Sequence, residues 1–102
     1  MLELDRMKIK MERERILGVA ISYGQAVFKL KAPYRHEDLI PMLTVFFVEL
    51  GSFFPFSQAD CGFYTTKRNF ADRRIGYAIA RQAGQLKRDF GPGGRLTSEN
   101  VW

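Results

Sequence analysis

The sequence contains a single cysteine, Cys61, and a single histidine, His36, among its 102 residues. One cysteine excludes an internal disulfide and is typical of a protein kept in a reducing compartment. No run approaches the roughly 20 apolar residues that cross a bilayer. Residues 1–15 are charged throughout and lack the apolar centre of a signal peptide. We therefore expect a cytoplasmic protein without a membrane partner.

Recognisable catalytic motifs are also missing. The sequence has no Cys/His cluster with metal-ligand spacing, no glycine-rich phosphate loop with its lysine, and no turn built around a nucleophilic serine. His36 stands beside Glu37 and Asp38, which would permit acid–base work. A lone histidine among helix-start acids is, however, more typical of a structural hydrogen bond. We expect a protein that is not an enzyme and that requires neither metal nor cofactor.

Positive charge is abundant and unevenly placed. The net charge is +5, and 14% of the residues are aromatic, including nine phenylalanines. Basic and acidic residues balance up to Thr66, so the whole excess lies from Lys67 onward. Such an excess favours anionic partners, but alone it does not separate a nucleic acid from a small phosphorylated ligand. A solvated helix face explains Arg74, Arg81, Lys87 and Arg88 equally well.

Hydrophobic periodicity predicts one α+β domain, with a small antiparallel sheet and two main helices packed on it. Residues 16–22 and 26–31 are expected to form a β-hairpin, and residues 62–65 a further strand. The first helix starts near Glu37 and Asp38, has apolar residues at helical spacing up to Leu50, and stops at Gly51; we expect it to be core-forming. Residues 52–60 would be an edge strand, a covering loop or a dimer contact.

The second helix is expected to begin at Arg73, with Asp72 as its N-cap and a break at Gly84. Its predicted apolar face consists of Ile75, Ala78, Ile79, Ala83 and Leu86. The domain organisation that follows is a single ligand-binding domain over residues 16–102. Residues 1–15 are a charged extension with a weak helical pattern through Leu4, Met7 and Met11, and it could be dispensable.

Binding of a nucleotide-like ligand fits the residues better than catalysis. Phe63 could stack on an adenine, and Arg35 and Arg95 could grip a pyrophosphate with forked, charge-assisted hydrogen bonds. Asp72 could accept from a sugar hydroxyl, in competition with its N-cap role. Arg73 either contributes to the site or pairs locally with an acid.

Three motifs carry a resemblance to a known family. They are Gly62-Phe63-Tyr64-Thr65 leading to Phe70-Ala71-Asp72-Arg73, then Ala83-Gly84-Gln85, and Leu96-Thr97-Ser98-Glu99-Asn100-Val101-Trp102. Upstream, residues 34–40 are similar to a further stretch of that family. Together these motifs resemble the phage-encoded Thoeris anti-defence proteins of the first-described type. The resemblance covers roughly residues 16–102.

The resemblance implies a nucleotide-signal sponge in the host bacterial cytoplasm. Such a protein holds cyclic ADP-ribose isomers without cleaving them, so that the defence effector stays silent. Carried over by position, Arg35 and Arg95 would contact phosphates, Phe63 would stack on the base, and Asp72 would lie near the ligand. His36, within residues 34–40, and Arg73 are counted as further candidate ligand-binding residues on the same basis. Several relatives form dimers and hexamers and hold cyclic oligonucleotides at separate sites, which implies a homo-oligomer.

Two other functions stay open at the level of sequence. A basic nucleic-acid-binding protein would account for the interleaved arginines and aromatic rings, and its affinity would fall steeply with salt. A protein-binding inhibitor of a host defence complex would use the exposed-looking stretch from Phe53 to Phe56.

Overall fold

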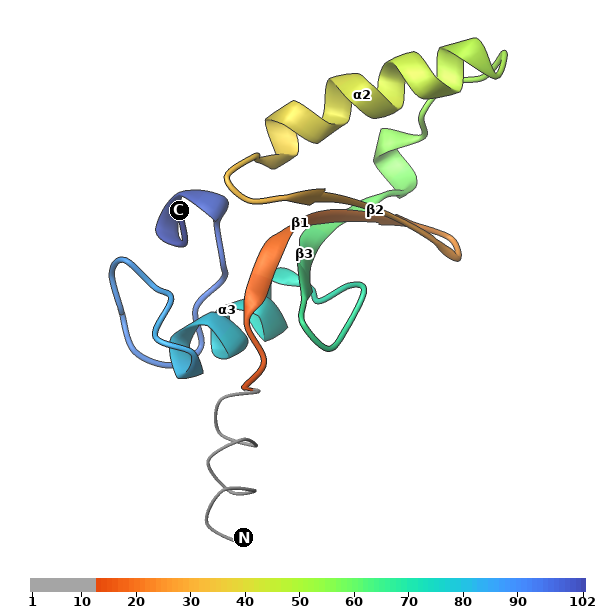
Figure 1. Cartoon of the computed structure of the whole chain (residues 1–102). Helices are drawn as coiled ribbons and strands as arrows, with labels where there is room; N and C mark the ends of the chain where they lie inside the picture. Colours follow the sequence, from red (N-terminus) through yellow and green to blue (C-terminus); the bar gives the residue numbers. More distant parts are fainter. Residues whose placement is uncertain (1–12) are drawn as a thin grey trace, which may run out of the picture.

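A computed structural model describes residues 13–102 and contains a three-stranded antiparallel sheet with two α-helices (Figure 1). The elements in chain order are β1 (Ile16–Tyr23), β2 (Ala26–Lys31), α2 (His36–Glu49), the 3-10 turn η1 (Phe56–Gln58), β3 (Asp60–Thr65), α3 (Arg73–Gln82) and the 3-10 turn η2 (Ser98–Asn100). The strand order is β2-β1-β3. The predicted α+β class, with a small antiparallel sheet and two main helices, is confirmed.

The β1–β2 hairpin forms as its sequence predicts. Gly24 adopts a positive φ of 58° in the two-residue turn, a conformation that glycine reaches without steric cost. Val19 in β1 pairs with Leu30 in β2 and, on its other side, with Phe63 in β3. As the central strand, β1 is buried over most of its length, which explains its continuous apolar run.

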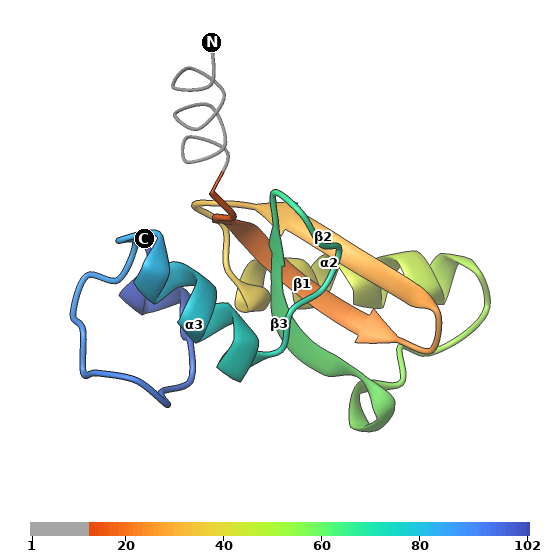
Figure 2. The same ribbon diagram turned by 90° about the horizontal axis from the view of Figure 1, so that it is seen from below.

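The two helices pack on different parts of the sheet. In Figure 1, α2 lies above the hairpin and α3 lies below it, beside β3 and the C-terminal segment. Figure 2 shows the same separation from below, with α2 behind the hairpin. One hydrophobic core joins both layers through fully buried Val19, Ile21, Phe63 and Leu96. Among residues 13–102 no helix has the length and apolar character needed to cross a bilayer.

The predicted ends of α3 are confirmed, and its predicted apolar face is confirmed in part, because Ile79 and Leu86 pack against the core. Asp72 caps the helix, since its Oδ1 accepts from the backbone N–H groups of Arg74 and Ile75 at 2.9 and 2.8 Å. The buried residues are Gly76, Tyr77 and Ala80, whereas Ile75 is 43% exposed. Tyr77 is buried because it packs against the glycine loop between α3 and the C-terminal segment.

Tyr77 holds the glycine loop against α3. Its hydroxyl donates to the carbonyl of Gly91 at 2.8 Å. A Cβ at Gly94 would lie 2.6 Å from the Tyr77 ring, so only glycine allows the loop to pass this close. Sequence periodicity within α3 carries no signal of this contact, because its partner lies about 15 residues away in a loop.

The predicted core face of α2 is confirmed for Leu39, Leu43 and Phe47 and is wrong for Phe46 and Leu50. Leu39 and Leu43 are buried, while Phe46 and Leu50 are largely exposed. The helix runs past the sheet in Figure 1. The chain then returns as a covering loop, not as an edge strand, and inserts Phe54 into the core.

Residues 13–15 are part of the domain. The Glu14 carboxylate accepts from the Arg68 guanidinium at 2.7 and 3.0 Å and from the Thr65 hydroxyl. Arg13 donates to the carbonyl of Gln82 at 2.7 Å. The helical pattern through Leu4, Met7 and Met11 lies outside the described residues, so the dispensability of residues 1–12 stays a prediction.

Two glycine substitutions test this packing. Gly62→Ala should destabilise the fold by about 1–3 kcal/mol, because the new Cβ would overlap the carbonyl of Ala71 and lie 2.7 Å from the Phe70 ring. Gly76→Ala is the matched comparison. Its Cβ would lie 3.3 Å from Leu96 Cδ2, and alanine gains about 1 kcal/mol of helix propensity. Urea denaturation should show a clear loss for the first variant and little change for the second; equal losses would contradict the described packing.

Candidate functional site

The start of α2 directs the Arg35 side chain toward the C-terminal segment. Arg35 is the extended N-cap residue of α2, and its backbone N–H donates to the Asp38 carboxylate at 2.8 Å. Glu37 and Asp38 occupy the first turn, where the helix dipole favours negative charge. The predicted strand-to-helix junction is thus confirmed. It fixes the backbone position from which the Arg35 side chain extends.

The Arg35 guanidinium anchors the last residues of the chain. It donates to the Ser98 hydroxyl at 2.9 Å and to the main-chain oxygen of Trp102 at 2.6 Å. The Trp102 indole in turn donates to the carbonyl of Tyr34 at 3.2 Å. These bonds join residues more than 60 positions apart and bring two of the recognised motifs together.

His36 connects α2 to β3. Its Nε2 lies 2.7 Å from the carbonyl oxygen of Gly62. A carbonyl can only accept, so Nε2 carries the hydrogen. The ring meets Phe63 edge-on, with centroids 5.4 Å apart. Burial lowers the pKa of His36 below its ordinary value of 6.5, and the positive charge of Arg73 lowers it further, while the bond to Gly62 acts in the opposite direction.

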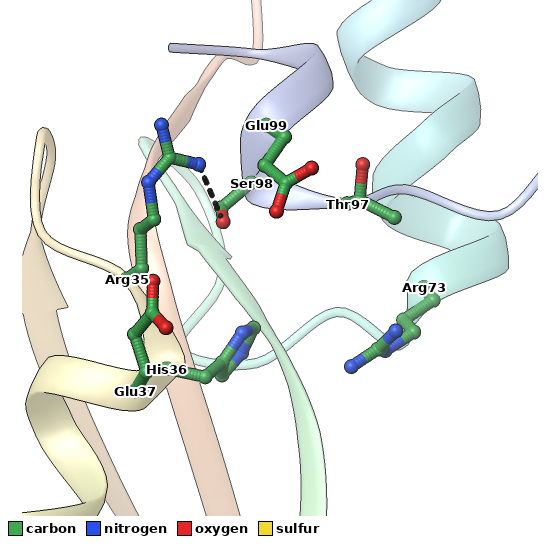
Figure 3. A pocket seen from close by; sticks show the side chains of 7 residues that line it. All are labelled: Arg35, His36, Glu37, Arg73, Thr97, Ser98 and Glu99. Atoms are coloured by element: carbon green, nitrogen blue, oxygen red, sulfur yellow. Dashed lines mark hydrogen bonds between the residues drawn. The ribbon is translucent and has the colours of Figure 1, made fainter.

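A polar cavity of about 240 Å³ lies between the start of α2, the start of α3 and the C-terminal segment (Figure 3). We call it the Arg35–Arg73 cavity. Its lining residues are Arg35, His36, Glu37, Arg73, Thr97, Ser98 and Glu99. Figure 3 shows the residues of α2, of α3 and of the C-terminal segment on three sides of an open centre. Two arginines, two glutamates, a serine and a threonine therefore line one space.

A second cavity of about 510 Å³ adjoins the first, and we call it the Arg73–Arg95 cavity. Its lining residues are Ala59, Asp60, Cys61, Phe70, Asp72, Arg73 and Arg95. Arg73 lines both cavities. A third hollow of about 390 Å³, near Phe90, shares Arg95 with the second cavity and Thr97 and Glu99 with the first. The segment from Arg95 to Glu99 therefore runs between all three.

The structure groups the predicted site residues differently from the prediction. Arg35, His36 and Arg73 line the first cavity, and Asp72, Arg73 and Arg95 line the second. Arg35 and Arg95, expected to grip one pyrophosphate together, line different cavities of this chain. Each of them instead shares a cavity with Arg73. The sequence had allowed Arg73 either a place in the site or a local pairing with an acid.

The predicted stacking role of Phe63 is not compatible with its position. Phe63 has an exposure of 0% because the pleat of β3 turns it into the core. His36 and Trp102 meet its ring edge-on, at 5.4 and 6.3 Å between centroids, and a Cβ at Gly76 would lie 3.4 Å from it. Phe70, which lines the Arg73–Arg95 cavity, is the aromatic side chain available to a ligand there.

Sequence reasoning missed Phe70, Glu37 and the residues around Leu96. Leu96 is fully buried, whereas Arg95 and Thr97 on either side of it are exposed. The backbone N–H of Leu96 donates to the carbonyl of Arg73 at 2.8 Å. A lone apolar residue between polar neighbours was the available signal that this segment is docked, with its polar side chains turned toward the cavities.

Asp72 remains available for a ligand despite its capping role. Both capping bonds go to Oδ1, so Oδ2 is open to a further donor. No group of three or more His, Cys, Asp or Glu side chains within residues 13–102 is arranged to hold a metal ion.

The fold and the cavities define a small α+β protein with a guanidinium-lined polar surface. The family model of the phage T4 y16D protein matches residues 15–102, and the chain therefore belongs to this phage protein family. No curated protein and no solved structure matches the chain. The matched range begins one residue before β1, so it includes both cavities.

The buried His36 should make stability depend on pH. Because its pKa in the folded state lies below 6.5, the unfolded chain binds a proton that the folded chain does not. This contribution to stability is complete above about pH 6.5 and is lost as pH falls toward the folded value. We expect a lower thermal midpoint at about pH 5.5 than at about pH 7.5.

His36→Gln is the control for this pH dependence, since an amide can still donate to the carbonyl of Gly62. The variant should unfold at nearly the same temperature at both pH values. Glu14 and Asp89 also have lowered pKa values, owing mainly to Arg68 and to the backbone N–H of Gly91, respectively. Both carboxyls titrate well below this window. An undiminished pH dependence in the variant would show that His36 is not the group responsible.

Proposed function

We propose that this chain is a phage anti-defence sponge that binds a cyclic ADP-ribose-type signalling nucleotide and holds it without cleaving it. The observation that carries the proposal is the position of Arg73, whose side chain lines two adjacent cavities. Each cavity therefore has two arginines in its lining: Arg73 with Arg35 in the first, and Arg73 with Arg95 in the second. A ligand with two linked phosphates presents the matching charge pattern.

The guanidinium groups are suited to phosphate binding. A planar guanidinium donates two parallel hydrogen bonds to phosphate oxygens, which a lysine cannot do. Within residues 13–102, the side chains of Arg73 and Arg95 have no hydrogen bond or salt bridge in the structure, so neither must give up a partner to bind. Arg35 uses two of its five donors for Ser98 and Trp102 and is held rigidly by them.

The remaining lining groups match the rest of a nucleotide. Carboxylates accept from ribose hydroxyls, and Glu37, Glu99, Asp60 and Asp72 surround the two cavities. Stacking of a base on an aromatic ring contributes about 1–3 kcal/mol, and Phe70 is the ring that lines the larger cavity. A small, polar, mixed-charge site of this kind suits a compact ligand better than a long polyanion.

Sequestration is favoured over catalysis by the state of His36. Its Nε2 hydrogen is committed to the carbonyl of Gly62, and burial keeps the ring neutral. The histidine therefore has a structural role, in which it joins α2 to β3 at the wall of the cavity. Membership of a phage protein family, together with the resemblance to Thoeris anti-defence proteins, supports action in the cytoplasm of the infected host, and the same resemblance supports a homo-oligomer.

A binding experiment with glyco-cyclic ADP-ribose tests the proposal. We expect the ligand to raise the thermal midpoint of the protein, because it binds only the folded state. We also expect it to be recovered chemically intact after the protein is heat-denatured. Hydrolysed products would show an enzyme. An unchanged thermal midpoint in the presence of the ligand would contradict the proposed sponge function. Tight binding of a long oligonucleotide with steep salt dependence would favour the nucleic-acid alternative.

Arg73→Ala should weaken this binding about 10- to 100-fold, since a hydrogen bond to a charged group is worth roughly 1.5–3 kcal/mol. The folded state should be preserved because the Arg73 side chain makes no hydrogen bond or salt bridge to any residue from 13 to 102. Arg74→Ala is the matched control, as Arg74 is exposed in the same turn of α3 and lines neither cavity. Isothermal titration calorimetry of the two variants should separate them. Equal affinities would contradict the assignment of Arg73.

A further inference from the structure

The loop between α3 and the C-terminal segment presents an exposed aromatic ring. Residues 87–95, which we call the Phe90 loop, extend away from the sheet in both views of the chain (Figure 1, Figure 2). Phe90 is 72% exposed, and the Arg88 guanidinium carbon lies 5.2 Å from the centroid of its ring. A single exposed apolar side chain is common on protein surfaces. What distinguishes Phe90 is the structure built around it.

Hydrogen bonds fix the backbone on both sides of the Phe90 ring. Asn100 binds both backbone groups of Arg88, because its side-chain oxygen accepts from the N–H at 3.0 Å and its side-chain nitrogen donates to the carbonyl at 3.1 Å. The Tyr77 hydroxyl accepts from the Phe90 N–H at 3.3 Å while it donates to the carbonyl of Gly91. A loop that is already ordered loses less conformational entropy when a partner binds. The Phe90 loop therefore presents its ring in a fixed position.

The third hollow, of about 390 Å³, lies beside this ring and differs in chemistry from the other two cavities. Its lining is more apolar than polar, whereas the Arg35–Arg73 and Arg73–Arg95 cavities are more polar than apolar. Arg88 and Arg95 are its basic lining residues, and Glu99 is its acidic one. The hollow therefore suits an apolar group that has a negative charge next to it.

The positive charge of Arg88 is available to such a group. Within residues 13–102 the Arg88 side chain has no hydrogen bond or salt bridge. The neighbouring Asp89 carboxylate is bonded instead to the Arg81 guanidinium, at 2.9 Å. A guanidinium donates two parallel hydrogen bonds to a carboxylate, and arginine and aromatic residues are enriched at protein interfaces. The apolar lining favours a protein side chain over a phosphate chain.

We propose that the Phe90 loop is a docking site for a short acidic segment of a different protein. An apolar side chain of that segment enters the hollow against Phe90, and a carboxylate next to it in sequence pairs with Arg88. The net charge of +5, all of it from Lys67 onward, attracts an acidic partner to this part of the chain. The inference does not depend on the nucleotide-binding proposal, because Arg88 and Phe90 line neither of the two cavities proposed for the nucleotide.

Titration of the full chain with acidic peptides tests this proposal. The probes are end-blocked pentapeptides in which four glutamates surround a central leucine, phenylalanine or tryptophan. At least one of them should cause saturable shifts of the backbone amide signals of residues 87–95 in two-dimensional NMR spectra. Peptides with lysine in place of glutamate, or with serine at the centre, should bind at least about tenfold more weakly. No saturable shift with any of the three acidic peptides, or equal binding of the lysine peptides, would overturn the proposal.

Substitutions in the Phe90 loop separate a specific site from general electrostatic attraction. Phe90→Ser and Arg88→Gln should each weaken peptide binding about 5- to 10-fold, since each removes one of the two expected anchors. Lys87→Gln is the matched control for Arg88→Gln. It removes the same charge from the neighbouring residue, which does not line the hollow, and should leave the affinity nearly unchanged. Equal losses for these two variants would reduce the interaction to net charge and overturn the assigned site.

Two further arms keep this proposal separate from the others. The three variants should bind glyco-cyclic ADP-ribose as the wild-type chain does. A chain that binds the acidic peptides but not the nucleotide would contradict only the sponge function, and the reverse result would contradict only the docking site. Larger shifts of the same amide signals with a short single-stranded DNA, lost steeply on addition of salt, would assign the Phe90 loop to nucleic acid and overturn the proposal.

Discussion

The arrangement of the candidate site depends on the hydrogen bonds of the Arg35 guanidinium. One residue at the N-terminus of α2 holds Ser98 and Trp102, and the Trp102 indole returns a bond to Tyr34. A charge-assisted pair of this kind is worth more than neutral hydrogen bonds. These bonds hold the last residues against the start of α2. The Arg35–Arg73 cavity exists because these bonds, with the burial of Leu96, close the chain onto itself.

Arg73 is placed by the same closure. Its carbonyl accepts from the backbone N–H of Leu96, so the start of α3 and the segment from Arg95 to Glu99 lie side by side (Figure 2). Arg73 then lines two cavities, one together with Arg35 and the other together with Arg95. Residues that hold the structure and residues that remain free to bind are thus separate. Arg35 and His36 bond to other parts of the chain, whereas the Arg73 and Arg95 side chains have no such bond within the described part of the chain.

Local features of the sequence predicted the fold well, and contacts between distant segments were harder to predict. The hairpin, the Asp72 cap and the Gly84 break depend on a few neighbouring residues, so periodicity and turn chemistry were sufficient. The face of α3 was predicted only in part, because Ile75 is exposed and Tyr77 packs on Gly94 instead. The role of Phe63 was wrong because the pleat of β3 turns it inward. Most predicted site residues do line the cavities, but the pairing of Arg73 with Arg35 and Arg95 arises only when three segments meet.

A structure of the protein crystallised with glyco-cyclic ADP-ribose tests the central claim most directly. We expect an intact ligand in the adjacent Arg35–Arg73 and Arg73–Arg95 cavities, with phosphate oxygens within hydrogen-bonding distance, roughly 2.7–3.2 Å, of the Arg73 guanidinium. A ligand bound elsewhere, or bound here without contact to Arg73, would contradict it.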